Sequence, residues 1–179
     1  ELQMIFNNPA SYIITIVFLL FWQFLFFLNA FLVGEASLRG LFDWLPWLLM
    51  ILVPAVTMGS IAQEKSEGTL EVVLTHPVRD PDLIIGKFIG SWIFVSSLLL
   101  FTIPLAASFA LFGKVDFGII LSQFFASSLM AGSLVAMGIF ISSRSPSQIA
   151  ALLVSGVASF GFIIMGSEFI TINIPLFFV

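Results

Sequence analysis

Long apolar runs alternate with short polar segments along the chain. Five of the runs contain no Asp, Glu, Lys or Arg, and they cover approximately residues 9–33, 44–62, 88–113, 117–143 and 146–167. A bilayer core about 30 Å thick requires roughly 20 apolar residues in helical conformation. The runs also lack the period-two alternation of a transmembrane β-barrel. The pattern therefore predicts an all-α, polytopic transmembrane bundle of five spans, forming a single domain over residues 1–179.

The composition agrees with a membrane protein. Hydrophobic residues make up 60% of the chain and charged residues 9%, with a mean hydropathy of +1.17. A soluble domain is about a quarter charged. The absence of cysteine excludes disulfides and thiolate ligands, and no basic run of the kind that binds nucleic acid is present.

The two ends of the sequence predict that it belongs to a longer protein. It begins at Glu1 rather than Met, and it ends inside an apolar stretch, residues 169–179. That stretch is too short to cross a bilayer alone, and Pro175 interrupts it. We therefore expect a sixth span or a re-entrant hairpin to follow residue 179.

Three spans are preceded by a polar residue and a proline. Asn, Asp and Ser cap the free amides of a first helical turn, and proline at the next position has no amide to leave unpaired. Because these pairs precede spans one, three and five, an alternating topology places all three starts on the same side of the membrane. The pairs are Asn8-Pro9, Asp80-Pro81 and Ser145-Pro146.

The basic residues predict which side that is. Four lie on the side of these helix starts, and two, Arg39 and Lys114, lie on the other. Basic residues concentrate in cytoplasmic loops. We therefore expect a multi-pass protein of the inner (cytoplasmic) membrane with a cytoplasmic N-terminus. The four basic residues are Lys65, Arg79, Lys87 and Arg144.

Small residues recur every four positions in the last two spans. Such spacing allows helices to approach closely in lipid. It fits packing within one bundle, and also a subunit interface or the wall of a translocation path. The residues are Ser128, Gly132 and Ala136, and Ala151, Ser155 and Ser159.

The spans contain few strongly polar side chains. Gln23, Asn29 and Gln123 are the notable ones, suited to hydrogen bonds between helices or to lining a polar path. The absence of charge from the spans argues against a proton-driven carrier or a selective ion channel. It fits a lipid-like, peptide or polymer substrate better.

Half of the chain's Asp, Glu, Lys and Arg residues fall in one loop, residues 63–87. Within it, Leu70, Val73 and Leu74 recur with helical spacing, while Glu67 and Glu71 lie on the polar side. This predicts a short amphipathic helix that starts near Gly68-Thr69 and stops before Pro77. So short a helix requires a partner surface, which is the membrane surface, neighbouring helices or another protein.

No catalytic motif is present. Gly86-Lys87 alone is not a phosphate-binding loop, so ATP hydrolysis, if any, belongs to a partner. His76 is the sole histidine and, without cysteine, does not make a metal site. We therefore predict that the chain is not an enzyme and holds no cofactor or metal.

The charged loop carries a resemblance to a known family. "SIAQEKSEGTLEVVLTHPVRDPDLIIGKF" resembles the first cytoplasmic loop of ABC-2 type permeases, the membrane subunits of one branch of ABC transporters. The shared pattern is an acidic-basic pair, Gly-Thr-Leu-Glu, an apolar run, a proline and a Gly-Lys pair. The opening "FNNPASYIITIVFLL" also resembles the family, particularly its gliding-motility-type and copper-oxidase-maturation-type permeases. The family usually has six spans, whereas five are recognisable here.

The resemblance implies a function for the loop. In the family, this loop contains a coupling helix that docks on a separate cytoplasmic ABC ATPase, which binds ATP and Mg²⁺. Leu70, Val73 and Leu74 would then make the apolar contact. The remaining coupling residues would be Glu64, Lys65, Glu67, Gly68, Thr69, Glu71 and Arg79.

The leading hypothesis is the permease subunit of an ATP-driven exporter, surrounded by membrane lipid, paired with a like or unlike permease subunit and with two ATPase subunits. A second hypothesis is a non-transporting membrane scaffold whose ATPase drives an extracytoplasmic partner protein, as in gliding motility. A third, and the least favoured, is a secondary carrier, which would show gradient-driven flux without an ATPase.

Overall fold

The computed structural model describes residues 9–33, 39–66, 68, 80–104 and 117–166. Within these ranges the secondary structure is helical and contains no strand, which confirms the all-α fold. The helices are α2 (Pro9–Val33), α3 (Arg39–Thr57), α4 (Ala62–Ser66), α6 (Asp80–Leu100), α8 (Phe117–Arg144) and α9 (Gln148–Gly166).

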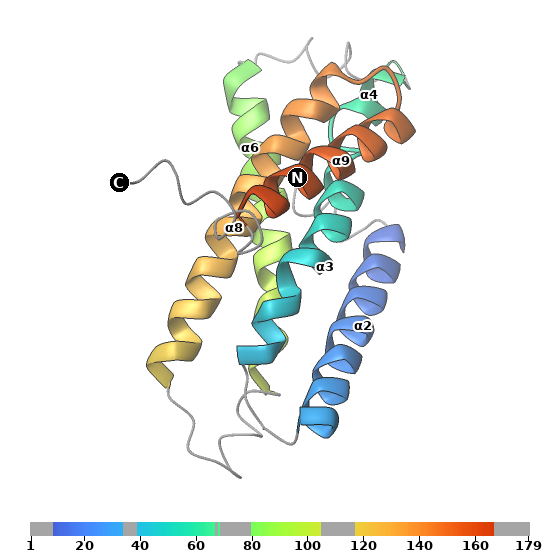
Figure 1. The fold of residues 1–179 in the computed structure, drawn as a ribbon. Helices are drawn as coiled ribbons and strands as arrows, with labels where there is room; N and C mark the ends of the chain where they lie inside the picture. The colour runs from blue at the N-terminus through green and yellow to red at the C-terminus, as the bar shows by residue number, and fades with distance from the viewer. Residues whose placement is uncertain (1–8, 34–38, 67, 69–79, 105–116, 167–179) are drawn as a thin grey trace, which may run out of the picture.

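The long helices alternate in direction (Figure 1). α3 and α8 end toward the upper end of the bundle in that view, and α2, α6 and α9 start from that side. α4 also lies at the upper end. This end therefore contains both described flanks of the charged loop, together with the connection between α8 and α9.

α3 and α8 form the centre of the bundle. They pack against each other and both contact α9, while α2 packs on α3 and α6 packs mainly on α8. The core is built from large apolar side chains with almost no exposed surface. Examples are Trp22, Leu49, Val53, Leu98 and Leu134.

A chain of aromatic rings joins α2 to α3 and α8. The rings of Phe18 and Trp22 lie 5.4 Å apart between centroids, and Trp22 lies 6.4 Å from Phe42. Phe42 in turn meets Phe124 of α8 edge to face at 5.1 Å. Aromatic pairs favour such tilted arrangements. They are an important attachment of α2 to the rest of the bundle.

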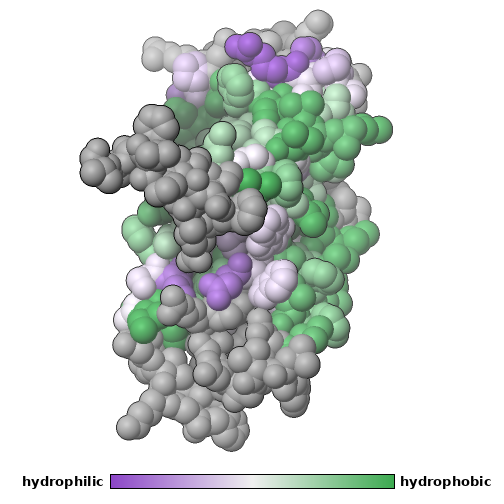
Figure 2. Space-filling model, viewed as in Figure 1, coloured by the Kyte–Doolittle hydropathy of each residue, from purple (hydrophilic) through white to green (hydrophobic). Residues whose placement is uncertain are grey.

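The outer surface of the bundle is apolar. α6, α8 and α9 contain the segments that are long and apolar enough to cross a membrane, Pro81–Leu100, Gly118–Arg144 and Gln148–Gly166. α2 and α3 contribute shorter apolar stretches with described side chains, Ser11–Leu25 and Phe42–Thr57. Figure 2 shows hydrophobic surface along the flank, hydrophilic surface at the upper end and a second hydrophilic area in the lower half of the view. This arrangement fits a helical bundle surrounded by lipid.

Several helix boundaries differ from the sequence predictions. The second span is predicted to run to Ala62, but α3 ends at Thr57 and the chain turns before α4 begins. The fifth helix is predicted to start at Pro146, but α9 starts at Gln148. Its cap is Ser147, whose Oγ accepts a hydrogen bond from the Ala150 amide at 3.3 Å.

The other two proline-associated helices start at the edge of the described residues, and the predicted Asn8 cap lies outside them. α2 begins at Pro9, and α6 begins at Asp80, ahead of the predicted span because the apolar run excludes the charges before Phe88. α6 ends at Leu100, inside the predicted third span of residues 88–113, which is therefore interrupted. A turn follows, in which Thr102 donates to the Leu99 carbonyl oxygen at 2.6 Å.

Candidate functional site

The upper end of the bundle in Figure 1 contains the anchoring points of the charged loop. The predicted amphipathic helix lies outside the described residues, and so do Glu67, Thr69, Leu70, Glu71, Val73, Leu74 and Arg79. The structure describes the chain entering the loop, from α3 through α4 to Gly68, and the chain leaving it, along α6. The site is therefore built from these two flanks.

α4 is a short helix that the sequence reading did not predict. It contains the predicted coupling residues Glu64 and Lys65, and the Lys65 side chain is exposed. Just beyond it, Gly68 has a φ of 70° and its amide donates to the Lys65 carbonyl oxygen at 3.4 Å. A left-handed glycine after the last turn is a common helix stop. Gly68 therefore ends α4.

The turn between α3 and α4 is held by a serine from α8. Ser142 Oγ accepts hydrogen bonds from the Ile61 amide at 3.2 Å and from the Ala62 amide at 3.1 Å. The same hydroxyl lies 3.3 Å from the Met58 carbonyl oxygen, to which it can donate. The amides at a helix start have no partner within the helix, so Ser142 supplies one from another helix. Ser142 has no exposed surface.

α3 and α8 approach closely one turn before this bond. A Cβ on Gly138 would lie closest to Thr57 Oγ1, and would also come within 3.0 Å of Thr57 Cβ and 3.2 Å of Thr57 Cγ2. Gly138 and Ser142 are four residues apart and therefore share one face of α8. The glycine allows the last turn of α3 to rest against α8, and this brings the following turn within reach of the Ser142 hydroxyl.

α6 is joined to α8 by polar contacts deeper in the bundle. Trp92 Nε1 donates to the Ser128 carbonyl oxygen at 2.8 Å, and the hydroxyls of Ser96 and Ser128 lie 3.0 Å apart. A Cβ on Gly132 would lie 3.1 Å from Trp92 Nε1. The indole therefore fits against α8 because residue 132 has no side chain.

Both described flanks of the loop are thus attached to α8. The predicted small-residue spacing contributes to this packing, since Ser128 and Gly132 contact α6, and Ala151, Ser155 and Ser159 are buried. Ala136 is exposed and does not continue the contact. The sequence reading missed Gly138 and Ser142, although their four-residue spacing matches the pattern sought.

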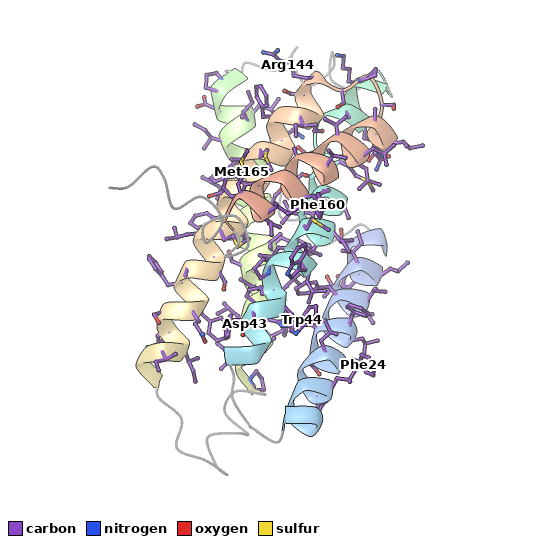
Figure 3. All side chains as sticks on the ribbon, in the orientation of Figure 1. Phe24, Asp43, Trp44, Arg144, Phe160 and Met165 are labelled. Carbon is purple, nitrogen blue, oxygen red and sulfur yellow. The ribbon has the colours of Figure 1, made fainter. Side chains whose placement is uncertain are left out.

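The charged residues of this end divide into buried and exposed groups. Lys87 is only 2% exposed, so it lies within the protein. Lys65 and Arg144 are exposed, and the Arg144 guanidinium lies over the Phe140 ring at 5.2 Å from its centroid. Figure 3 places Arg144 at the upper end and Asp43 far below it on α3.

The predicted polar residues of the spans do not form one cluster. Gln23 is half-buried on α2, and the side chain of Asn29 lies outside the described residues. Gln123 is half-buried in the second turn of α8, where its Oε1 is buried and has no hydrogen-bond partner among the described residues. The described residues also contain no group of three His, Cys, Asp or Glu side chains that could hold a metal ion.

Comparison with protein families identifies the fold. Residues 28–179 match the family described as ABC-2 family transporter protein. The chain belongs to the ABC-2 transporter family. This ABC-2 protein is therefore a multi-pass membrane protein and a permease component of an ABC-type system. No curated protein and no solved structure matches the chain.

Proposed function

We propose that this ABC-2 protein is the permease subunit of an ATP-driven exporter, and that the loop of residues 63–87 docks on a separate cytoplasmic ATPase. The family match carries the proposal because it covers most of the chain. The charge pattern of the loop supports the docking role, since half of the chain's charged residues lie there. ATP and Mg²⁺ bind the partner subunit.

The attachment of the loop supports a mechanical role. The chain entering the loop is bonded to α8 by Ser142, and the chain leaving it is bonded to α8 by Trp92. A loop fixed at both flanks transmits a displacement as a rigid-body motion of the attached helices. In this mechanism, closure of the ATPase on ATP displaces the loop and the helices move with it.

The exposed basic residues support a cytoplasmic position of the loop. Lys65 and Arg144 are exposed at the same end of the bundle, whereas Asp43 is exposed toward the other end. Basic residues mark the cytoplasmic side. We therefore place α4 and the N-terminus in the cytoplasm and the protein in the inner membrane, in a complex with a second permease subunit.

The docking surface can be tested by introducing negative charge at its apolar positions. In Leu70→Asp, Leu74→Asp, two carboxylates replace the apolar contact, so we expect the tagged protein to lose the co-purifying ATPase. The matched control, Leu70→Met, Leu74→Met, keeps the apolar character and similar volume and should retain it. Equal ATPase recovery with both variants would refute docking through this face.

A further inference from the structure

The Ser142 side chain bonds α8 to the backbone between α3 and α4. The residues on either side of it do not share this role. Ser143 Oγ donates to the Phe140 carbonyl oxygen at 2.7 Å and Ser145 Oγ to the Ile141 carbonyl oxygen at 2.8 Å, both in the preceding turn of the same helix. Of these three hydroxyls, that of Ser142 bonds outside its own helix.

We propose that Ser142 is a positioning residue that clamps the base of the charged loop to α8, so that α8 moves with the loop. This inference rests on the proposed function, because it names the bond through which the loop's displacement reaches the bundle. The clamp consists of one hydroxyl and three backbone groups, those of Met58, Ile61 and Ala62.

The location of the clamp favours this role over general stabilisation. α3 ends at Thr57, so the chain between α3 and α4 has no continuous helical backbone to carry a displacement. Ser142 bonds this interruption to α8. The hydroxyl has no exposed surface, so water does not replace it readily when the bond is lost.

α8 is the helix that receives the displacement. It also bonds the other flank of the loop through Trp92 and Ser128, and it packs against α3, α6 and α9. A displacement of α4, on the entering flank, is therefore passed through α8 to α6, on the leaving flank. Without the Ser142 bond, α4 keeps its packing against α8 and α9 but loses the hydrogen bonds that join its first turn to α8, so we expect α8 to follow its displacement less closely.

Spin-label distance measurements test the clamp in the isolated protein. The sequence contains no cysteine, so Lys65→Cys on α4 and Leu129→Cys on α8 provide a unique label pair on exposed positions. Leu129 lies about 20 Å along α8 from Ser142 at 1.5 Å rise per residue. The protein is reconstituted in lipid nanodiscs, and the width of the distance distribution is recorded.

In this background Ser142→Ala should broaden the distribution, and the matched control Ser143→Ala should not. Loss of a buried hydrogen-bond partner corresponds to a roughly tenfold larger population of the detached conformation. Should Ser142→Ala fail to purify, Ala62→Pro removes one of the two donated amides at a helix position that proline tolerates and should also broaden it. A distribution unchanged in the purified variants overturns the clamp.

The second measurement uses the complex with the ATPase. With Ser142 intact, the Lys65–Leu129 label distance should stay the same with and without trapped nucleotide, whereas in Ser142→Ala it should shift when nucleotide is trapped. Because both labelled proteins carry the same Lys65→Cys change, ATPase co-purification should be equal in the two. A nucleotide-dependent shift in the protein with Ser142 intact refutes joint movement. Failure of the wild-type chain to retain any ATPase refutes the proposed function instead, and the nanodisc comparison still decides the clamp.

Discussion

Substitution of Gly138 by alanine tests the packing that sets the position of the loop. The added Cβ would meet the Thr57 side chain, with Thr57 Cβ at 3.0 Å and Thr57 Cγ2 at 3.2 Å, so α3 and α8 must separate. Gly156 of α9 is the matched control, because a Cβ added there meets no atom within 4 Å. Both changes introduce the same residue into the middle of an apolar helix.

The expected difference in stability between Gly138→Ala and Gly156→Ala follows from the space available at each glycine. Replacing glycine by alanine within a helix favours the helix by roughly 0.5–1 kcal/mol at either site. At Gly138 the crowding against Thr57 adds a cost of about 1–3 kcal/mol. For a chain of this size that difference corresponds to a melting temperature about 3–9 °C lower for Gly138→Ala than for Gly156→Ala.

The assay is thermal unfolding of the purified protein in detergent, followed by the fluorescence of its four tryptophans. Thr57→Ala provides the second arm, because it removes the Oγ1 and Cγ2 atoms from the crowded contact. It should recover much of the loss in the Gly138→Ala background and give no gain in the Gly156→Ala background. Equal melting temperatures for the two glycine variants, or equal effects of Thr57→Ala in both backgrounds, would refute the close contact between α3 and α8.

Three further predictions concern the bundle and its orientation. Trp22→Ala should cost about 3–5 kcal/mol because the side chain is fully buried between α2 and α3, whereas Phe21→Ala, at an exposed position, should change the melting temperature little. Ser147→Ala should remove about 1 kcal/mol of capping and speed hydrogen exchange in the first turn of α9, and unchanged exchange would contradict the assigned cap. In sealed vesicles of known orientation, a thiol reagent that does not cross the membrane should label Lys65→Cys from the cytoplasmic side and Asp43→Cys from the opposite side; the reverse result would invert the proposed topology.

The long helices could be predicted because a bilayer requires continuous apolar length. The run of residues 117–143 and the helix Phe117–Arg144 nearly coincide, since Arg144 and the following Ser-Pro pair end both the apolar run and the helix. Apolar length does not, however, locate a break inside a run. α3 ends at Thr57 within residues 44–62, at a turn whose amides bond to Ser142, about 80 residues away in sequence.

The helix cap of α9 shows a second limit. Ser145 and Ser147 flank Pro146, and either could cap a helix by residue type. The hydroxyl of Ser145 donates to the Ile141 carbonyl oxygen of the preceding helix, which leaves Ser147 to accept from Ala150. Which serine caps α9 depends on the geometry of the connection between α8 and α9, and residue type alone does not determine it.

Only part of the candidate site could be predicted from the sequence. The charged loop was evident from the concentration of charge, and the resemblance to ABC-2 permeases agrees with the family match. The clamp is not evident from the sequence, because serine is frequent in α8 and three of its serines, Ser122, Ser133 and Ser143, bond within the helix. Only the three-dimensional approach at Gly138 distinguishes Ser142 from its neighbours.

Site-specific photo-crosslinking in intact cells tests the central claim most directly. A photoreactive amino acid at position 70 of the loop should form a crosslink to an ABC ATPase, and the same amino acid at Ile93, an exposed apolar position of α6, should form none to that partner. If position 70 instead crosslinks only to lipid, the loop does not dock on an ATPase and the proposed coupling is contradicted.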